Sequence, residues 1–196
     1  MEIRELAKRL KEQEEKGAFK KDGIYAKWSQ EHMNKAEFNL LSARIEYLLL
    51  TDENVRKSSE LFSNYDKFDW LIIKSYYAMY HSVLALLAEL GFKSETHFAT
   101  IVAFELFFVR RNKLVEEKFL DMLMKIMERV GTIPYDYIKM LMQARKARHL
   151  AQYDVTSSVV MNEAEDSFEM SIEFIEEMKK VYDKLKEVKK NMNFEF

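Results

Sequence analysis

The chain contains no cysteine, one proline and only four glycines among its 196 residues. Without cysteine it can form neither a disulfide nor a metal-thiolate site. Scarce glycine and proline leave little material for the turns of a β-rich fold, and they exclude a Gly-rich loop that holds phosphate through backbone N–H groups. We therefore expect one compact, mostly helical domain whose functional site consists of helix-borne side chains or helix N-termini.

The chain also lacks a large excess of positive or negative charge, since its formal net charge is −2. A protein that coats nucleic acid without specificity should be clearly basic, so any contact with nucleic acid would be a local patch. The N-terminal segment is charged from its second residue and has no apolar run of the kind that secretion requires. Lys74 and Glu89 interrupt the apolar stretch 70–90, which predicts a buried helix rather than a membrane span. We expect a cytoplasmic protein with no membrane partner.

Apolar residues recur at the helical period along most of the chain, and no segment alternates convincingly at the period of a strand. Gly17, Gly91 and Gly131 follow three of the expected helices and suit their ends. The helix at 68–90 is apolar on nearly every side, so we expect other helices or a dimer partner to surround it. The expected helices cover residues 2–16, 29–50, 55–62, 68–90, 94–111, 114–130 and 135–153, and a last one of about 28 residues follows Asn162.

Three helix starts carry capping signals. Ser29 and Ser94 are candidate N-caps of the helices that they begin. Asn162 with Glu165 three residues later has the spacing of a capping box. These signals predict where the helices 29–50 and 94–111 and the last helix begin.

Common catalytic and metal motifs are missing. A di-iron site in a helical bundle needs Glu-x-x-His pairs, but none of the four histidines has a glutamate three residues before it. The chain has no His-Glu-x-x-His zinc motif and no Gly-x-Ser-x-Gly nucleophile motif. We therefore predict no metal site and no cofactor.

One segment departs from the balanced charge. Residues 138–153, IKMLMQARKARHLAQY, hold five basic or titratable side chains and no carboxylate. One interpretation is a solvated helix face whose cations favour the C-terminal end of the helix dipole. The other is a phosphate site, because the planar fork of arginine matches phosphate oxygens. The candidate phosphate-binding residues are Arg145, Lys146, Arg148 and, in the first turn of another expected helix, His97.

Aromatic residues on the 68–90 helix allow two interpretations. Tyr76, Tyr77 and Tyr80 suit packing in the core or a dimer interface, and they also suit stacking against nucleobases. His81, next to Ser82 in an otherwise apolar stretch, is best explained as a hydrogen-bonded core histidine. The residues favour packing over base stacking.

The segment Trp70-Leu-Ile-Ile-Lys-Ser-Tyr-Tyr-Ala-Met-Tyr-His-Ser, followed by Gly91 and Ser94-Glu-Thr-His97, resembles the HEPN superfamily (higher eukaryote and prokaryote nucleotide-binding domain). It is most similar to small archaeal and bacterial members with a Tyr-Tyr-Ala-Met-Tyr signature. Arg148-His-Leu-Ala-Gln-Tyr153-Asp154 falls where that subgroup has its arginine motif. The resemblance covers about 28–190, which we take as the domain, with 1–27 as an N-terminal helical extension and 191–196 as a tail.

The resemblance implies an all-α, antiparallel up-and-down bundle with a four-helix core plus extra helices. It also implies a homodimer in which two arginine motifs face one cleft. Many members are metal-independent endoribonucleases with an arginine followed, after a few residues, by a histidine. Matched in this way, the candidate catalytic residues are Arg148, His149 after it, and Tyr153 at the histidine position.

Tyr153 is a departure from that motif, because a phenol with a pKa of about 10 is a poor base at neutral pH. We therefore favour a protein that binds nucleotide or RNA, in a toxin-antitoxin or stress and defence system, over one that cleaves RNA. The alternative hypothesis is a non-catalytic helical partner subunit, for example of a minimal nucleotidyltransferase. Its docking surfaces would be the first helix and the end of the last helix.

Overall fold

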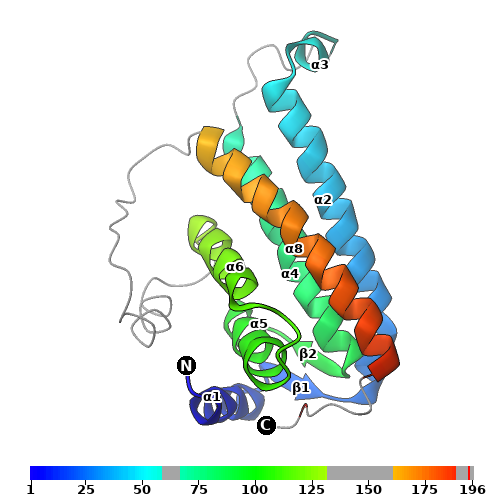
Figure 1. Ribbon diagram of the computed structural model, residues 1–196, viewed down its shortest axis with the longest axis vertical. Coiled ribbons are helices and arrows are strands. Elements are labelled where there is room, and N and C mark those ends of the chain that lie inside the picture. Colours follow the sequence, from blue (N-terminus) through cyan, green and yellow to red (C-terminus); the bar gives the residue numbers. More distant parts are fainter. Residues whose placement is uncertain (59–66, 132–160, 189–193, 195–196) are drawn as a thin grey trace.

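The computed structural model describes residues 1–58, 67–131, 161–188 and 194. Its centre consists of four helices, α2 (Ser29–Thr51), α4 (Phe68–Glu89), α6 (Glu117–Arg129) and α8 (Met161–Val188). Figure 1 shows α2 and α6 running in one direction and α4 and α8 in the opposite one. The α4 helix contacts the other three. The all-α bundle predicted from the sequence is confirmed.

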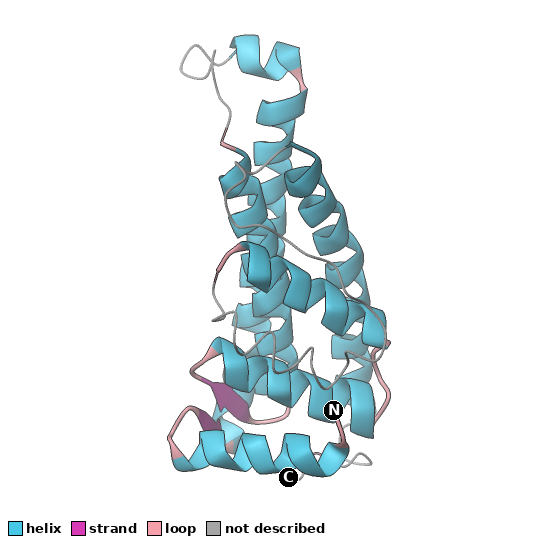
Figure 2. Cartoon of the chain, turned by 90° about the vertical axis from the view of Figure 1, so that its left-hand side faces the viewer, coloured by secondary structure: helices cyan, strands magenta, loops and turns pink. Residues whose placement is uncertain are grey.

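Smaller elements surround one end of these helices. The first helix, α1, lies across that end, roughly perpendicular to the long helices (Figure 2). Its Leu6 and Leu10 are fully buried, and it contacts α5 and η3. The expected extension 1–27 is therefore packed against the bundle, and the domain boundary at residue 28 stays a prediction. These elements are α1 (Ile3–Glu15), β1 (Phe19–Lys21), the 3₁₀ helix η1 (Gly23–Trp28), β2 (Phe92–Ser94), α5 (His97–Phe104) and the π-helix η3 (Glu105–Arg111). The short helix α3 (Glu53–Ser58) lies at the opposite end, beyond α2 (Figure 1).

A small antiparallel sheet was not predicted. β1 pairs with β2, with Phe19 opposite Ser94 and Lys21 opposite Phe92. The rings of Phe19 and Phe92 stack with their centroids 5.2 Å apart. Each strand has only three residues, too few to show an alternating pattern in the sequence. This ladder joins the chain before α2 to the chain before α5.

The α4 helix is the core of the molecule. Among the described residues it is the one helix long and apolar enough to cross a membrane, and 72% of its most apolar window is buried inside the structure. It extends from Phe68 to Glu89, and Gly91 follows with a φ of +79°. The buried helix predicted for 68–90 is confirmed.

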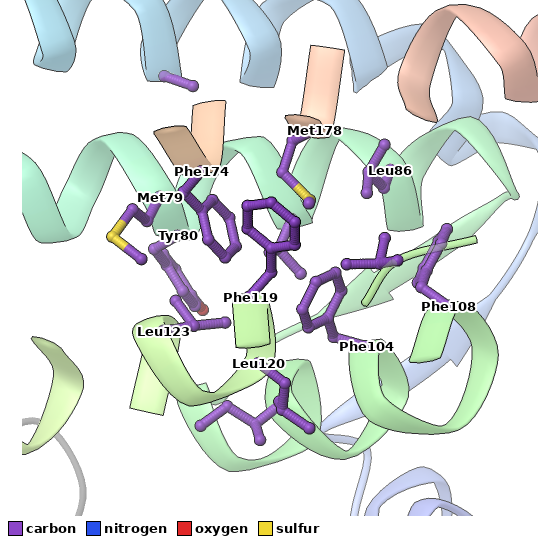
Figure 3. Packing of buried hydrophobic residues seen from close by; sticks show 14 of the residues in the cluster. Met79, Tyr80, Leu86, Phe104, Phe108, Phe119, Leu120, Leu123, Phe174 and Met178 are labelled. Atoms are coloured by element: carbon purple, nitrogen blue, oxygen red, sulfur yellow. The ribbon is translucent and has the colours of Figure 1, made fainter. Parts of the chain in front are cut away.

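Aromatic side chains from three helices fill the space beside α4 (Figure 3). Phe174 of α8 lies 6.1 Å from Phe104 of α5 and 6.0 Å from Phe119 of α6, measured between ring centroids. Phe104 and Phe174 are fully buried, and Phe119 nearly so. Met79 and Tyr80 of α4 approach the same cluster. This packing fixes α5 against α4, which positions the residues described below.

The three capping predictions are wrong in detail. Ser29 is the first residue of α2 and does not cap it; its hydroxyl donates to Glu89 (2.7 Å) and lies 3.0 Å from the Tyr182 hydroxyl. Thr96, not Ser94, caps α5. Asn162 lies inside α8 as its second residue. The Ser29 hydroxyl thus binds tertiary partners instead of the helix N-terminus, and at α5 a neighbouring residue forms the cap.

Candidate functional site

His97 is the predicted site residue that the structure places. It is the first residue of α5, whose N-terminus is fixed by Thr96, which accepts a hydrogen bond from the Ala99 N–H (3.2 Å). The Thr100 hydroxyl lies within hydrogen-bonding distance of the Ser94 hydroxyl (2.8 Å) and of the Thr96 carbonyl oxygen (3.0 Å). This local network holds the start of α5 in one geometry and sets the direction of the imidazole.

The imidazole of His97 contacts the tyrosines of α4. The Tyr76 hydroxyl and His97 Nδ1 are 2.6 Å apart, and the rings of Tyr80 and His97 have centroids 4.6 Å apart. The Tyr80 hydroxyl lies 3.3 Å from that of Thr100. Burial lowers the pKa of His97 below its ordinary value, so the ring is neutral at neutral pH. A neutral imidazole fixed by a phenol can accept or donate one hydrogen bond at its remaining nitrogen.

Two further histidines meet where α2 packs against α4. Nδ1 of His32 in α2 and Nδ1 of His81 in α4 are 3.4 Å apart, and the two rings stack with centroids 5.6 Å apart. Burial is the main cause that lowers the pKa of His81 to about 4; His32 and Lys35 contribute. The pKa of His32 is also lowered, first by burial and then by Lys35. At neutral pH both rings are neutral, so one can donate a hydrogen bond to the other.

The three tyrosines of α4 differ in how much of their surface is exposed to solvent. Tyr76 is fully buried, whereas Tyr77 is 41% exposed. The Tyr77 ring has its centroid 4.9 Å from that of Tyr76 and 6.2 Å from that of His81, with which it stacks. Core packing, as the sequence favoured, describes Tyr76 and Tyr80. Tyr77 offers a ring to solvent.

Lysines surround the start of α5. Lys20 of β1 and Lys93 of β2 pair across the sheet, and their Nζ atoms lie 3.3 Å and 2.8 Å from the same carboxylate oxygen of Glu95. Glu95 lies two residues before His97. Together, Lys20, Lys93 and Glu95 carry two positive charges and one negative charge.

The remaining predicted site residues lie outside the described residues: Arg145, Lys146, Arg148, His149 and Tyr153. In the described ranges, no three or more His, Asp or Glu side chains are grouped so that they could hold a metal ion.

Sequence reasoning did not find the contact between His32 and His81, which are 49 residues apart. A signal was present in Lys74, a cation inside an otherwise apolar helix. Such a residue needs a carboxylate partner, and it forms an ion pair with the buried Glu46 of α2. That pairing would have placed α2 beside α4, the two helices that carry His32 and His81.

Comparison with known proteins gives one match. The model of the HEPN domain family matches residues 45–187, more than half of the chain and including α4, α5 and α6. No curated protein and no solved structure matches. The matched range contains the Tyr-Tyr-Ala-Met-Tyr segment, His97 and the basic segment 138–153. The chain belongs to the HEPN domain family.

Proposed function

We propose that this protein binds nucleotides or RNA. The observation that carries the proposal is the family match over 45–187, which spans both the aromatic helix α4 and the carboxylate-free segment 138–153. A chain with so few glycines has to hold phosphate through side chains or helix N-termini. The basic segment supplies the side chains, and α5 supplies a capped helix start that carries His97.

In this proposal the residues have separate roles. Arg145, Lys146 and Arg148 hold phosphate oxygens, Arg148 through its planar fork. His97 adds one neutral hydrogen-bonding nitrogen beside the lysines of the β-sheet. Tyr77 supports a nucleobase by stacking, because its ring is exposed and rests against Tyr76 and His81.

We further propose that binding, and not cleavage, is the principal activity. Metal-independent cleavage needs a base that removes the proton of the ribose 2′-hydroxyl and a cation that stabilises charge on the phosphate. Arg148 meets the second need. For the first, Tyr153 has a phenol in place of an imidazole, and His149 directly follows Arg148 in the sequence instead of standing where the family's motif has its histidine. A role in a toxin-antitoxin or stress and defence system, in the cytoplasm, belongs to the same proposal.

The experiment measures binding of fluorescently labelled single-stranded RNA and of nucleoside triphosphates by anisotropy. We expect Arg148→Ala to weaken RNA binding by about tenfold or more, as for loss of a phosphate-binding arginine. Arg4→Ala is the matched control, because it removes the same charge from an exposed site on α1. Equal weakening in both variants would show that the effect comes from net charge alone. Unchanged RNA binding by Arg148→Ala would show that Arg148 is not part of the binding site.

A parallel assay follows RNA integrity in excess EDTA. Intact RNA with the wild-type protein is the expected result. Cleavage that disappears in Arg148→Ala would show a nuclease and would overturn the preference for binding.

The structure gives no support to the alternative hypothesis of a partner subunit that docks through the first helix. The apolar residues Leu6 and Leu10 of α1 are already buried against α5 and η3. The amino group of Met1 is also bound, 3.3 Å from the buried carboxylate of Glu105. A partner would have to bind the outer face of α1, where Ile3 is the one large apolar side chain that is exposed.

A further inference from the structure

The small sheet and η1 form a basic surface that holds an exposed aromatic ring. β1, η1 and β2 contain four lysines, and the residues in and directly beside these elements include two carboxylates, Asp22 and Glu95. The whole chain has a net charge of −2, so this excess of cations is local. The sheet lies at the end of the long helices away from α3 (Figure 1). We call five of these residues the Trp28 patch: Lys20, Tyr25, Lys27, Trp28 and Lys93.

Trp28 is the centre of the Trp28 patch. It is the last residue of η1 and directly precedes α2, and 36% of its surface is exposed. The Nζ atoms of Lys27 and Lys93 lie 5.6 Å and 5.9 Å from the centroid of the indole ring. The ring of Tyr25 has its centroid 5.4 Å away and is tilted by 38°. Two ammonium groups and a second aromatic ring thus flank one exposed indole.

The backbone around the Trp28 patch is fixed by hydrogen bonds. Asp22 caps η1, and its N–H donates to the Gly91 carbonyl oxygen (2.9 Å), which joins η1 to the chain before β2. In the sheet, Lys20 lies opposite Lys93. Because these elements are held together before any ligand arrives, little ordering is needed for them to bind one.

We propose that the Trp28 patch binds one nucleotide of a single-stranded RNA. The nucleobase stacks on Trp28, and the phosphates on either side of it lie against Lys27 and Lys93. This inference rests on the proposed function, in which the protein binds RNA. An aromatic ring can stack on any unpaired base, whereas a duplex keeps the faces of its bases stacked inside. A base within a strand has a phosphate on each side, which matches two ammonium groups better than the single phosphate of a free mononucleotide does.

The lysines can turn from the ring to a phosphate. Lys27 is exposed, and 39% of the Lys93 side chain is exposed, so neither leaves a buried cavity when it moves. The attraction of an ammonium group to an exposed ring is weak, and a charge-assisted hydrogen bond to a phosphate oxygen is stronger. Lys93 shares Glu95 with Lys20, whose Nζ lies 3.3 Å from the same carboxylate oxygen. Glu95 therefore keeps a partner when Lys93 moves.

The family match does not account for the Trp28 patch. It begins at residue 45, so Lys20, Tyr25, Lys27 and Trp28 lie outside the matched range. The patch shares no residue with the arginine motif around Arg148. Each can therefore be changed without altering the other.

The first test is tryptophan fluorescence, because the chain has two tryptophans, Trp28 and Trp70. Trp70→Phe leaves Trp28 as the reporter, and we expect saturating single-stranded oligoadenylate RNA to quench its emission by about half or more through stacking. Trp28→Phe leaves Trp70 of α4 as the reporter, and the same RNA should change that emission much less. A sugar-phosphate strand of equal length without bases should leave the emission of Trp28 unchanged.

Anisotropy of labelled RNA on the same samples separates this inference from the proposed function. RNA binding without quenching of Trp28 would overturn the Trp28 patch and leave the proposed function standing, whereas absence of RNA binding would overturn both. Equal quenching by the strand without bases would overturn stacking. Quenching by adenosine monophosphate at the same concentration as by the strand would overturn the assignment to a strand.

The second test addresses the phosphate contact. Lys27→Gln should weaken RNA binding and reduce the slope of log affinity against log salt by about 0.7, the value for one phosphate contact on a single strand. Lys57→Gln is the matched control, because Lys57 is 69% exposed on α3 at the opposite end of the long helices (Figure 1). It should keep the wild-type slope. Equal changes in both variants, or no change in Lys27→Gln, would overturn the contact.

Discussion

Acid should destabilise this protein through His81. Its folded-state pKa is about 4, lowered first by burial and then by His32 and Lys35. In the unfolded chain the pKa returns to about 6.5. Between these two values the unfolded state binds more protons than the folded state. The free energy of unfolding therefore rises with pH through this window. The contribution of His81 is complete above about pH 6.5 and decreases as the pH falls toward about 4.

The size of the effect follows from the pKa difference. At about 1.4 kcal/mol for each unit, the shift sets an upper bound of about 3 kcal/mol. Because solvent reaches part of both rings, we expect about 2 kcal/mol between neutral pH and about pH 4. The lowered pKa of His32 acts in the same direction.

The assay is urea unfolding, followed by circular dichroism, over a pH series for the wild type and His81→Phe. Phenylalanine keeps a ring against His32 and Tyr77 but takes up no proton, so its unfolding free energy should depend less on pH by about 2 kcal/mol across the window. Tyr77→Phe should keep the wild-type dependence. Equal pH dependence in His81→Phe and the wild type, or an NMR titration of His81 near pH 6.5, would refute the reasoning.

Three further predictions concern the fold that positions the site. Gly91→Ala should destabilise the protein by about 1–2 kcal/mol in thermal or urea unfolding, because φ is +79° and the new Cβ would lie 3.2 Å from the Asp22 carbonyl oxygen. Phe174→Ala should cost about 3–5 kcal/mol, since it empties the centre of a fully buried aromatic cluster. Lys74→Met should cost about 2–3 kcal/mol by removing the cation paired with buried Glu46, and adding Glu46→Gln should recover part of that loss; equal losses in the single and double variants would contradict it.

Helices with strong one-sided or all-round apolarity could be predicted from the sequence. The α4 helix differs from its predicted bounds by one residue, because a long apolar run ends at a glycine that adopts positive φ. The inner face of α2 could also be predicted from its spacing. The exposed apolar side chains on the outer face of α2, Phe38, Leu41, Ile45 and Leu48, were missed because periodicity identifies a first apolar face easily and hides a second one opposite to it.

Features that depend on distant partners could not be predicted. The hydroxyl of Ser29 had the local signature of a helix cap, yet it binds Glu89 and lies beside the hydroxyl of Tyr182, 153 residues away in the chain. The three-residue strands were too short for a pattern. In the site, the basic segment with Arg148 could be recognised from composition. The contact of His97 with Tyr76 depends on how Gly91 and the β-sheet turn α5 back onto α4.

The central claim is that Arg148 holds a phosphate of bound RNA. The most direct measurement is the salt dependence of RNA affinity for the wild type and Arg148→Ala. Loss of one phosphate contact should reduce the slope of log affinity against log salt by about one, together with weaker binding at every salt concentration. An unchanged slope and affinity in Arg148→Ala would contradict the claim.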